Sequence, residues 1–183
     1  MKTLFTFAVL TTLVSSLAFS QSGGSAAAEA TFTVGTPLTL MPAALPGDFG
    51  DLVPGTTYTV AADGAISPPD AGGATVVTPV GWDIMGQRGA NVEITFALPQ
   101  YFVSLTGSHV PYDVTPRSAG WAGMPFTTGL PYNPIDPRVP NTVTLVDSVG
   151  SASVQLGGVL ALPLGADGLY TAQFILTAAY TGL

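Results

Sequence analysis

The chain contains no cysteine, and its only lysine is Lys2. Without cysteine it forms no disulfide, carries no thiolate and has no site for a lipid anchor on an N-terminal cysteine. Without further lysine it forms no Lys–Asn isopeptide bond and no sortase link to a lysine side chain. Any polymer built from this chain must therefore rest on noncovalent contacts.

Charge is scarce as well. Asp, Glu, Lys and Arg make up 8% of the residues, against about 25% in a typical soluble domain. Past Ser20 the positive charges are Arg88, Arg117 and Arg138, against eleven acidic residues in the chain. This balance predicts no nucleic-acid partner and no anionic lipid partner, since both require basic patches. Sheet edges without lysine also lack a usual protection against pairing with another chain, which favours a subunit of an assembly.

Catalytic residue types are few. His109 is the only histidine and stands in an ordinary loop context, Gly-Ser-His-Val-Pro. A Ser–His–Asp site would require it, whereas a glycosidase needs only two carboxylates, and composition leaves that class open. Most aspartates stand beside Gly or Pro, where Asp commonly caps turns. We therefore predict a protein that is not an enzyme, with no catalytic residue.

Aspartates in loops raise the question of a calcium site. Their spacing matches neither an EF-hand nor a nonapeptide repeat, so we predict no metal site and no cofactor. The aspartates considered are Asp48, Asp51, Asp63, Asp70 and Asp167.

The first twenty residues have the pattern of a signal peptide. Lys2 supplies the positive region, residues 4–17 are apolar, and Ala18-Phe19-Ser20 is a small-x-small cleavage site. We therefore expect a secreted, extracellular or cell-surface protein. No later stretch approaches 18 continuous apolar residues, which predicts no membrane span. Residues 21–29 then form a flexible leader that begins Gln-Ser-Gly-Gly-Ser.

Residues 30–183 show short alternating runs separated by Gly, Pro and Asp-Gly turns. In residues 91–98, Val92, Ile94, Phe96 and Leu98 share one face. The last segment shows the longest alternation, with one face made of Tyr170, Ala172, Phe174, Leu176, Ala178 and Tyr180. About ten such strands predict one all-β domain folded as an antiparallel sandwich. A bend is expected at Gly157-Gly158, because glycines inside a strand pattern often mark one.

Residues 107–141 break the alternation with seven prolines. A structureless connection of this length is uncommon in a compact domain, and its aromatic residues argue against disorder. We predict an ordered excursion that lies on the sandwich or on a neighbouring subunit. Its aromatics fit a carbohydrate platform, a subunit interface or loop anchors; they are Tyr112, Trp121, Phe126 and Tyr132.

The start of the domain permits two interpretations. Ala30, Phe32 and Val34 alternate with threonines and follow the flexible leader. Residues 26–34 are therefore either the domain's own first strand or a strand that is donated to another copy.

Three segments resemble secreted bacterial pilin-like proteins related to spore coat protein U and, more distantly, to chaperone–usher pilins. They are Gly-Ala-Asn-Val-Glu-Ile-Thr-Phe-Ala-Leu-Pro at residues 89–99, Val-Gln-Leu-Gly-Gly-Val-Leu-Ala-Leu-Pro at 154–163, and Gly-Leu-Tyr-Thr-Ala-Gln-Phe-Ile-Leu-Thr-Ala-Ala-Tyr at 168–180. Asp48-Phe49-Gly50 also resembles the family's early turn. The resemblance spans most of residues 30–106 and 142–183. The family's disulfide is absent.

This resemblance implies an immunoglobulin-like sandwich that is completed by a strand from a neighbouring subunit. The donor residues would be Ala28, Ala30, Phe32 and Val34, and the alternating face of the last segment, Tyr170 to Tyr180, would form the acceptor groove. The implied function is a structural subunit of an extracellular fibre, with copies of itself, a periplasmic chaperone or an usher as partners. The alternative is an adhesin module that recognises glycan or another surface through residues 107–141.

Overall fold

The computed structural model describes residues 35–44, 46–69, 77–124, 131–146 and 148–181. These residues form strands and connections only, which confirms the all-β prediction. Among them there is no helix of the length and hydrophobicity that crossing a membrane requires. The predicted donor residues Ala28, Ala30, Phe32 and Val34, and also Phe126, lie outside the described residues.

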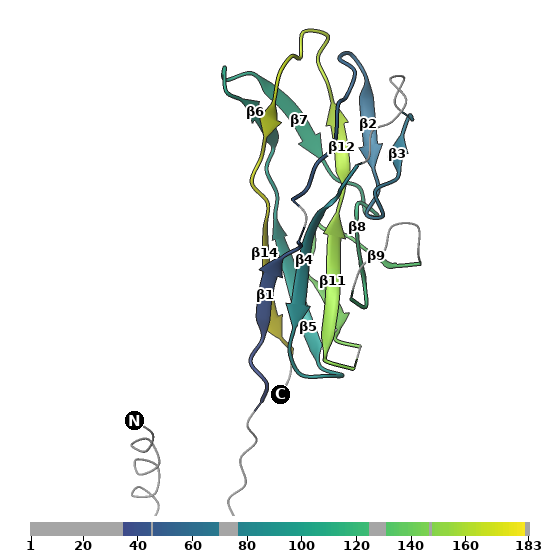
Figure 1. Cartoon of the computed structure of the whole chain (residues 1–183), viewed down its shortest axis with the longest axis vertical. Helices are drawn as coiled ribbons and strands as arrows, with labels where there is room; N and C mark the ends of the chain where they lie inside the picture. The colour runs from purple at the N-terminus through teal and green to yellow at the C-terminus, as the bar shows by residue number, and fades with distance from the viewer. Residues whose placement is uncertain (1–34, 45, 70–76, 125–130, 147, 182–183) are drawn as a thin grey trace, which may run out of the picture. The chain divides into compact units, whose positions relative to one another are not determined.

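The strands form three antiparallel sheets around one hydrophobic core (Figure 1). The five-stranded sheet has the order β1-β4-β11-β8-β9. Its strands are β1 (Thr39–Pro42), β4 (Val80–Met85), β11 (Ser151–Leu156), β8 (Ala119–Ala122) and β9 (Asn133–Ile135).

The other two sheets also contribute buried residues to this core. The three-stranded sheet has the order β10-β5-β14, with β10 (Asn141–Thr144), β5 (Asn91–Ala97) and β14 (Ile175–Tyr180). The six-stranded sheet has the order β13-β6-β7-β12-β2-β3. Its strands are β13 (Tyr170–Thr171), β6 (Tyr101–Ser104), β7 (His109–Asp113), β12 (Gly158–Ala161), β2 (Thr57–Val60) and β3 (Ile66–Ser67).

The predicted alternation holds where it is strongest. In β5, Val92 and Ile94 are fully buried while Glu93 is exposed. The last segment also alternates, but the structure divides it into two strands. β13 pairs with β6, and β14 pairs with β5. One continuous pattern therefore serves two sheets, because residues 172–174 pass between them.

Gly157 is the predicted bend, and it moves the chain from one sheet to another. β11 ends at Leu156 in the five-stranded sheet, and β12 begins at Gly158 in the six-stranded sheet. The backbone of Val60 lies so close to Gly157 that a Cβ there would meet the Val60 carbonyl oxygen. The Gly157 amide donates to the Ser118 carbonyl at 2.8 Å. The absence of a side chain at position 157 thus allows this crossing.

The prediction that residues 107–141 form an excursion lying on the sandwich is wrong. It contributes β7, β8, β9 and the first residue of β10 to the sheets, and β7 lies between β6 and β12. Its prolines occupy positions that a sheet tolerates. Pro111 lies beyond the two β7 residues that pair with β12, and Pro134 is in β9, an edge strand. The proline count therefore concealed strands of the core.

A tight turn precedes β10 in the same region. The Arg138 guanidinium donates to both carboxylate oxygens of Asp136, at 2.9 and 2.8 Å, and Asn141 donates to the Asp136 and Val139 carbonyls. The hydrogen bonds from Arg138 lower the pKa of Asp136 below its ordinary value. Both charged side chains face solvent, so the pair orders the turn more than it stabilises the fold.

Tyr112 ties β7 to Gly157, where the chain crosses from β11 to β12. Its hydroxyl donates to the Gly157 carbonyl oxygen at 2.6 Å. Burial, with a smaller effect from Asp113, raises the pKa of Tyr112 above its ordinary value.

We expect Tyr112→Phe to lower the free energy of unfolding by about 1–3 kcal/mol, because it leaves a buried carbonyl without its donor. Urea unfolding followed by tryptophan fluorescence measures this change. An unchanged midpoint would mean that water reaches this carbonyl in the variant.

Candidate functional site

Each of the three sheets has an end strand with an outer edge in the described part of the chain. β1 is the end strand of the five-stranded sheet, β14 ends the three-stranded sheet, and β13 ends the six-stranded sheet. Among the described strands, β1 pairs only with β4, β14 only with β5 and β13 only with β6. An edge strand presents backbone N–H and C=O groups on its outer side, which can pair with an added strand.

A groove of about 1250 Å³ lies between the end of β1 and β13, and Phe174, immediately before β14, also lines it. One wall is formed by Pro42 at the end of β1, by Ala43 and by residues 46–52 and 54. The opposite wall runs from Ala166 to Phe174 and includes β13. Val110, Leu160 and Leu162 close the bottom from β7 and β12 and the residue that follows it. The groove therefore separates the edge of one sheet from the edge of another.

Aromatic rings form its floor. Phe102 lies at the centre, with ring centroids 5.7 Å from Phe49, 5.7 Å from Tyr112 and 5.8 Å from Phe174. Tyr112 and Phe174 meet edge to face at 5.2 Å. Offset and edge-to-face pairs of this kind add to the stabilisation from burial alone. The floor is thus apolar and held by mutually packed rings.

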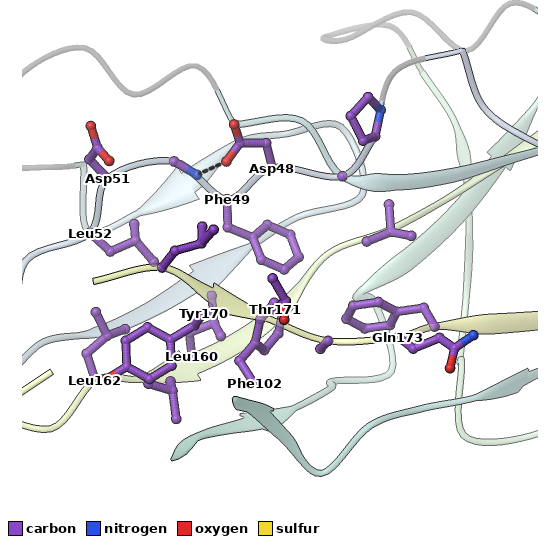
Figure 2. Close-up of a pocket in the computed structure, with 18 of the residues that line it drawn as sticks. Asp48, Phe49, Asp51, Leu52, Phe102, Leu160, Leu162, Tyr170, Thr171 and Gln173 are labelled. Atoms are coloured by element: carbon purple, nitrogen blue, oxygen red, sulfur yellow. Dashed lines mark hydrogen bonds between the residues drawn. The ribbon is translucent and has the colours of Figure 1, made fainter. Parts of the chain in front are cut away.

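The first wall is fixed by a turn at Asp48. Its Oδ1 accepts from the Gly50 amide at 2.8 Å, and its backbone pairs with Thr78 at 2.7 Å in both directions. Gly50 has a φ of 73°, which glycine adopts without strain. Figure 2 shows the Phe49 ring pointing into the groove, while the carboxylates of Asp48 and Asp51 point to the other side of the segment.

The second wall has backbone groups to offer. Among the described residues, no backbone hydrogen bond joins residues 172–174 to another segment. Ala172 and Phe174 turn toward the core and are half-buried, and Gln173 between them is exposed. A strand laid along this wall would find both hydrogen-bonding groups and an apolar surface.

Tyr180, the last residue of β14, lies outside the groove lining. Its hydroxyl donates to the Thr36 carbonyl at 2.9 Å and accepts from the Gln87 amide at 2.7 Å. These bonds tie the end of β14 to the residues that precede β1. They hold Thr36 at a defined place, two residues after Val34, the last of the predicted donor residues.

The structure brings together part of the predicted acceptor face. Tyr170, Ala172 and Phe174 line the groove. Leu176 is buried in the core, and Ala178 and Tyr180 are half-buried against it farther along β14. Sequence reasoning missed the facing wall and the floor, including Phe49, Leu52, Phe102, Leu160 and Leu162. The Asp-Phe-Gly signal at residues 48–50 was visible, but its position opposite residues 170–174 depends on tertiary packing.

The predicted aromatic surface is not assembled by the described residues. Tyr112 is only 7% exposed and belongs to the core, where its ring packs against Phe102 and Phe174, which corrects its assignment as a surface aromatic. Trp121 is half-buried against the core. Tyr132 is half-buried with its ring over Gly120. These two residues act as anchors of β8 and of the segment before β9.

His109 lies on the outer side of the β6–β7 hairpin. Its ring meets Tyr101 edge to face at 5.5 Å. Within the described ranges no group of three or more His, Asp or Glu side chains is placed to hold a metal ion.

The geometry of the groove favours binding of an extended apolar segment.

The chain was compared with models of known protein families, with curated proteins and with solved structures, and nothing matches in any of the three comparisons.

Proposed function

We propose that this chain is a secreted structural subunit of an extracellular fibre or pilus-like filament that polymerises noncovalently by strand donation. Residues 28–34 of one copy occupy the groove between the β1 side and the β13–β14 side of the next. The sandwich is then an immunoglobulin-like domain completed by its neighbour. Secretion follows from the signal-peptide pattern at residues 1–20.

The observation that carries the proposal is an apolar groove bordered by edge strands. A ligand pocket for a small molecule is usually surrounded by closed structure and a few convergent polar groups. Here the groove is bordered by the end of β1 and by β13, each of which ends its sheet, and by Phe174 immediately before β14. Strand addition uses both features, since main-chain hydrogen bonds give affinity and alternate side chains enter apolar subsites.

The proposed occupant has a length and an alternating pattern that suit strand addition. Seven extended residues span about 23 Å at 3.3 Å per residue. Ala28, Ala30, Phe32 and Val34 fall on one face, and Glu29 falls on the other. Burial of the Phe32 and Val34 side chains would contribute about 1.5–3 kcal/mol each. The charge of Glu29 stays on the solvent side of the added strand.

Composition supports a noncovalent joint. The chain has no cysteine for an intersubunit disulfide and no lysine after Lys2 for an isopeptide link. The edges that flank the groove lack lysine as well, so they carry no positive charge that would oppose an incoming strand.

Electron microscopy of the mature protein, residues 21–183, tests the proposal. We expect filaments from this protein, and a monomer of lower stability from a variant that begins at Gly35. Adding a synthetic peptide of residues 26–34 to the truncated protein should raise its melting temperature without producing filaments.

Two results would contradict strand donation. The first is filaments that persist in the protein that begins at Gly35. The second is a full-length protein that stays monomeric at high concentration with residues 26–34 protected from proteolysis, which would make this segment the domain's own first strand.

A further inference from the structure

The described domain has two ends of different construction, which we define by their loops (Figure 1). The hairpin end contains the β6–β7 turn, the β12–β13 connection and the start of β2. The exit end contains Thr36, the β4–β5 turn, the β10–β11 loop and the end of β14. The last segment runs from Tyr170 at the hairpin end to Tyr180 at the exit end, about 33 Å when extended.

The hairpin end exposes three leucines. Leu105, Leu164 and Leu169 are 99%, 89% and 73% exposed. β13 pairs with β6 so that Tyr170 lies opposite Ser104, and continuing this register places Leu169 beside Leu105. Leu164 follows β12 and lies against Gly55, whose amide bonds to the Leu162 carbonyl at 3.0 Å. Large apolar side chains grouped on loops commonly mark an interaction surface.

The exit end also exposes apolar side chains. Val146 and Val149, in the β10–β11 loop, are 50% and 70% exposed. This loop is held to the β4–β5 turn, with the Gly86 amide bonded to the Gly150 carbonyl at 2.8 Å and the Gly89 amide to the Leu145 carbonyl at 2.8 Å. The valines are therefore presented on a fixed surface beside the point where Tyr180 holds Thr36.

The position of Thr36, close to the proposed donor segment in the sequence, restricts how copies can stack. A donor strand that runs antiparallel to β13 and β14 ends, at Val34, at the hairpin end of the acceptor. Only Gly35 then separates it from Thr36, at the exit end of its own domain. The opposite direction would place two exit ends together, and the same surface would have to serve both neighbours of every subunit. A repeating filament requires a head-to-tail contact between two different surfaces.

We infer that the leucine-bearing hairpin end of each subunit docks against the valine-bearing exit end of the copy that donates its strand to it. This inference rests on the proposed function and names a second interface within the same joint. Leu105, Leu164 and Leu169 of the acceptor cover the loop that carries Val146 and Val149 of the donor. The donated strand links the copies, and the docked ends fix the angle between them.

Cysteine pairs test this contact, because the natural chain has no cysteine to react. The mature protein with Leu169→Cys and Val146→Cys should give a ladder of disulfide-linked oligomers after mild oxidation of filaments. The matched control combines Leu169→Cys with Thr59→Cys, an exposed residue of β2 on the outer face of the six-stranded sheet. That control should give no ladder. Leu105→Ser with Leu164→Ser, two leucines outside the groove lining, should raise the critical concentration for assembly about tenfold or more, since burial of one leucine corresponds to at least that factor.

The outcomes separate the two proposals. Two cross-linking results contradict end-to-end docking without contradicting strand donation. The first is filaments that give no disulfide ladder between positions 169 and 146. The second is filaments in which position 169 of one copy is linked to position 169 of another. Filaments whose critical concentration is unchanged by the two serine substitutions also overturn end-to-end docking. A mature protein that forms no filaments contradicts the proposed function and this inference together.

Discussion

Phe32→Asp is expected to abolish filament formation, whereas Thr33→Asp is expected to leave it nearly unchanged. Both variants add one negative charge to the same segment, one residue apart, so they have the same net charge. In an extended strand the two side chains point to opposite faces. The proposed donor strand buries position 32 against the rings of Phe49, Phe102 and Phe174 and leaves position 33 in solvent.

The size of this effect follows from burial. Phe32→Asp removes about 1.5–3 kcal/mol of apolar burial and places a carboxylate in an apolar site, which costs several kcal/mol more unless it is neutralised. A total above about 3 kcal/mol raises the critical concentration more than about 100-fold. Light scattering over a concentration series, with electron microscopy of the end points, measures it.

The Phe32→Asp protein provides a second measurement because its own groove is intact. It can receive a strand from an unmodified copy but cannot donate one. Small amounts of it mixed with the unmodified protein should therefore end growing filaments and shorten them in proportion to the amount added. Equal loss of assembly with Thr33→Asp, or no shortening in mixtures, would contradict the assigned face of the donor.

The second large effect is expected at Gly157. We expect Gly157→Ala to lower the free energy of unfolding by about 3 kcal/mol or more, because overpacking a well-packed core costs about 1–3 kcal/mol and more where backbone must move. The added Cβ would meet the Val60 carbonyl oxygen and come 2.6 Å from the Val60 carbonyl carbon. The hydrogen bonds of Gly157 to Ser118 and Tyr112 would shift with it. A typical domain has only about 5–15 kcal/mol of stability, so a large part would be lost.

Gly165→Ala is the matched control for Gly157→Ala. No atom lies within 4 Å of a Cβ placed at position 165, and its backbone does not require the left-handed conformation. Its stability should change by less than about 1 kcal/mol, toward greater stability, because alanine restricts the unfolded chain. Urea unfolding followed by the fluorescence of buried Trp82 reports both variants. Similar midpoints for the two would show that the crossing between the sheets tolerates a side chain.

Local pattern predicted the elements whose burial alternates along one strand. β5 was predicted from the alternation that contains its inward residues Val92, Ile94 and Phe96, and Asp63-Gly64 is one of the predicted Asp-Gly turns; Gly64 has a φ of 84°. The alternation of residues 170–180 was also correct, although its division into β13 and β14 was not predicted. Period-2 burial is a property of each strand by itself, but the sheet that a strand joins depends on residues far along the chain.

The strands of residues 107–141 were missed for a related reason. Prolines usually argue against a strand, yet Pro111 and Pro134 occupy positions where the ladder needs no amide hydrogen. Which positions are exempt depends on the pairing partners of β7 and β9. A count of prolines along the chain does not contain that information.

By itself the sequence determined an all-β antiparallel domain, the exclusion of covalent links through cysteine or lysine, and the alternating face of its last segment, because each follows from residue type or local periodicity. Only the tertiary structure decided where the groove lies. Phe49 and Phe174 are 125 residues apart along the chain, and both pack against Phe102. Only the packing of the sheets also decided that Leu105 and Leu169 share the end opposite Thr36, since strand pairing carries separate turns to a common end.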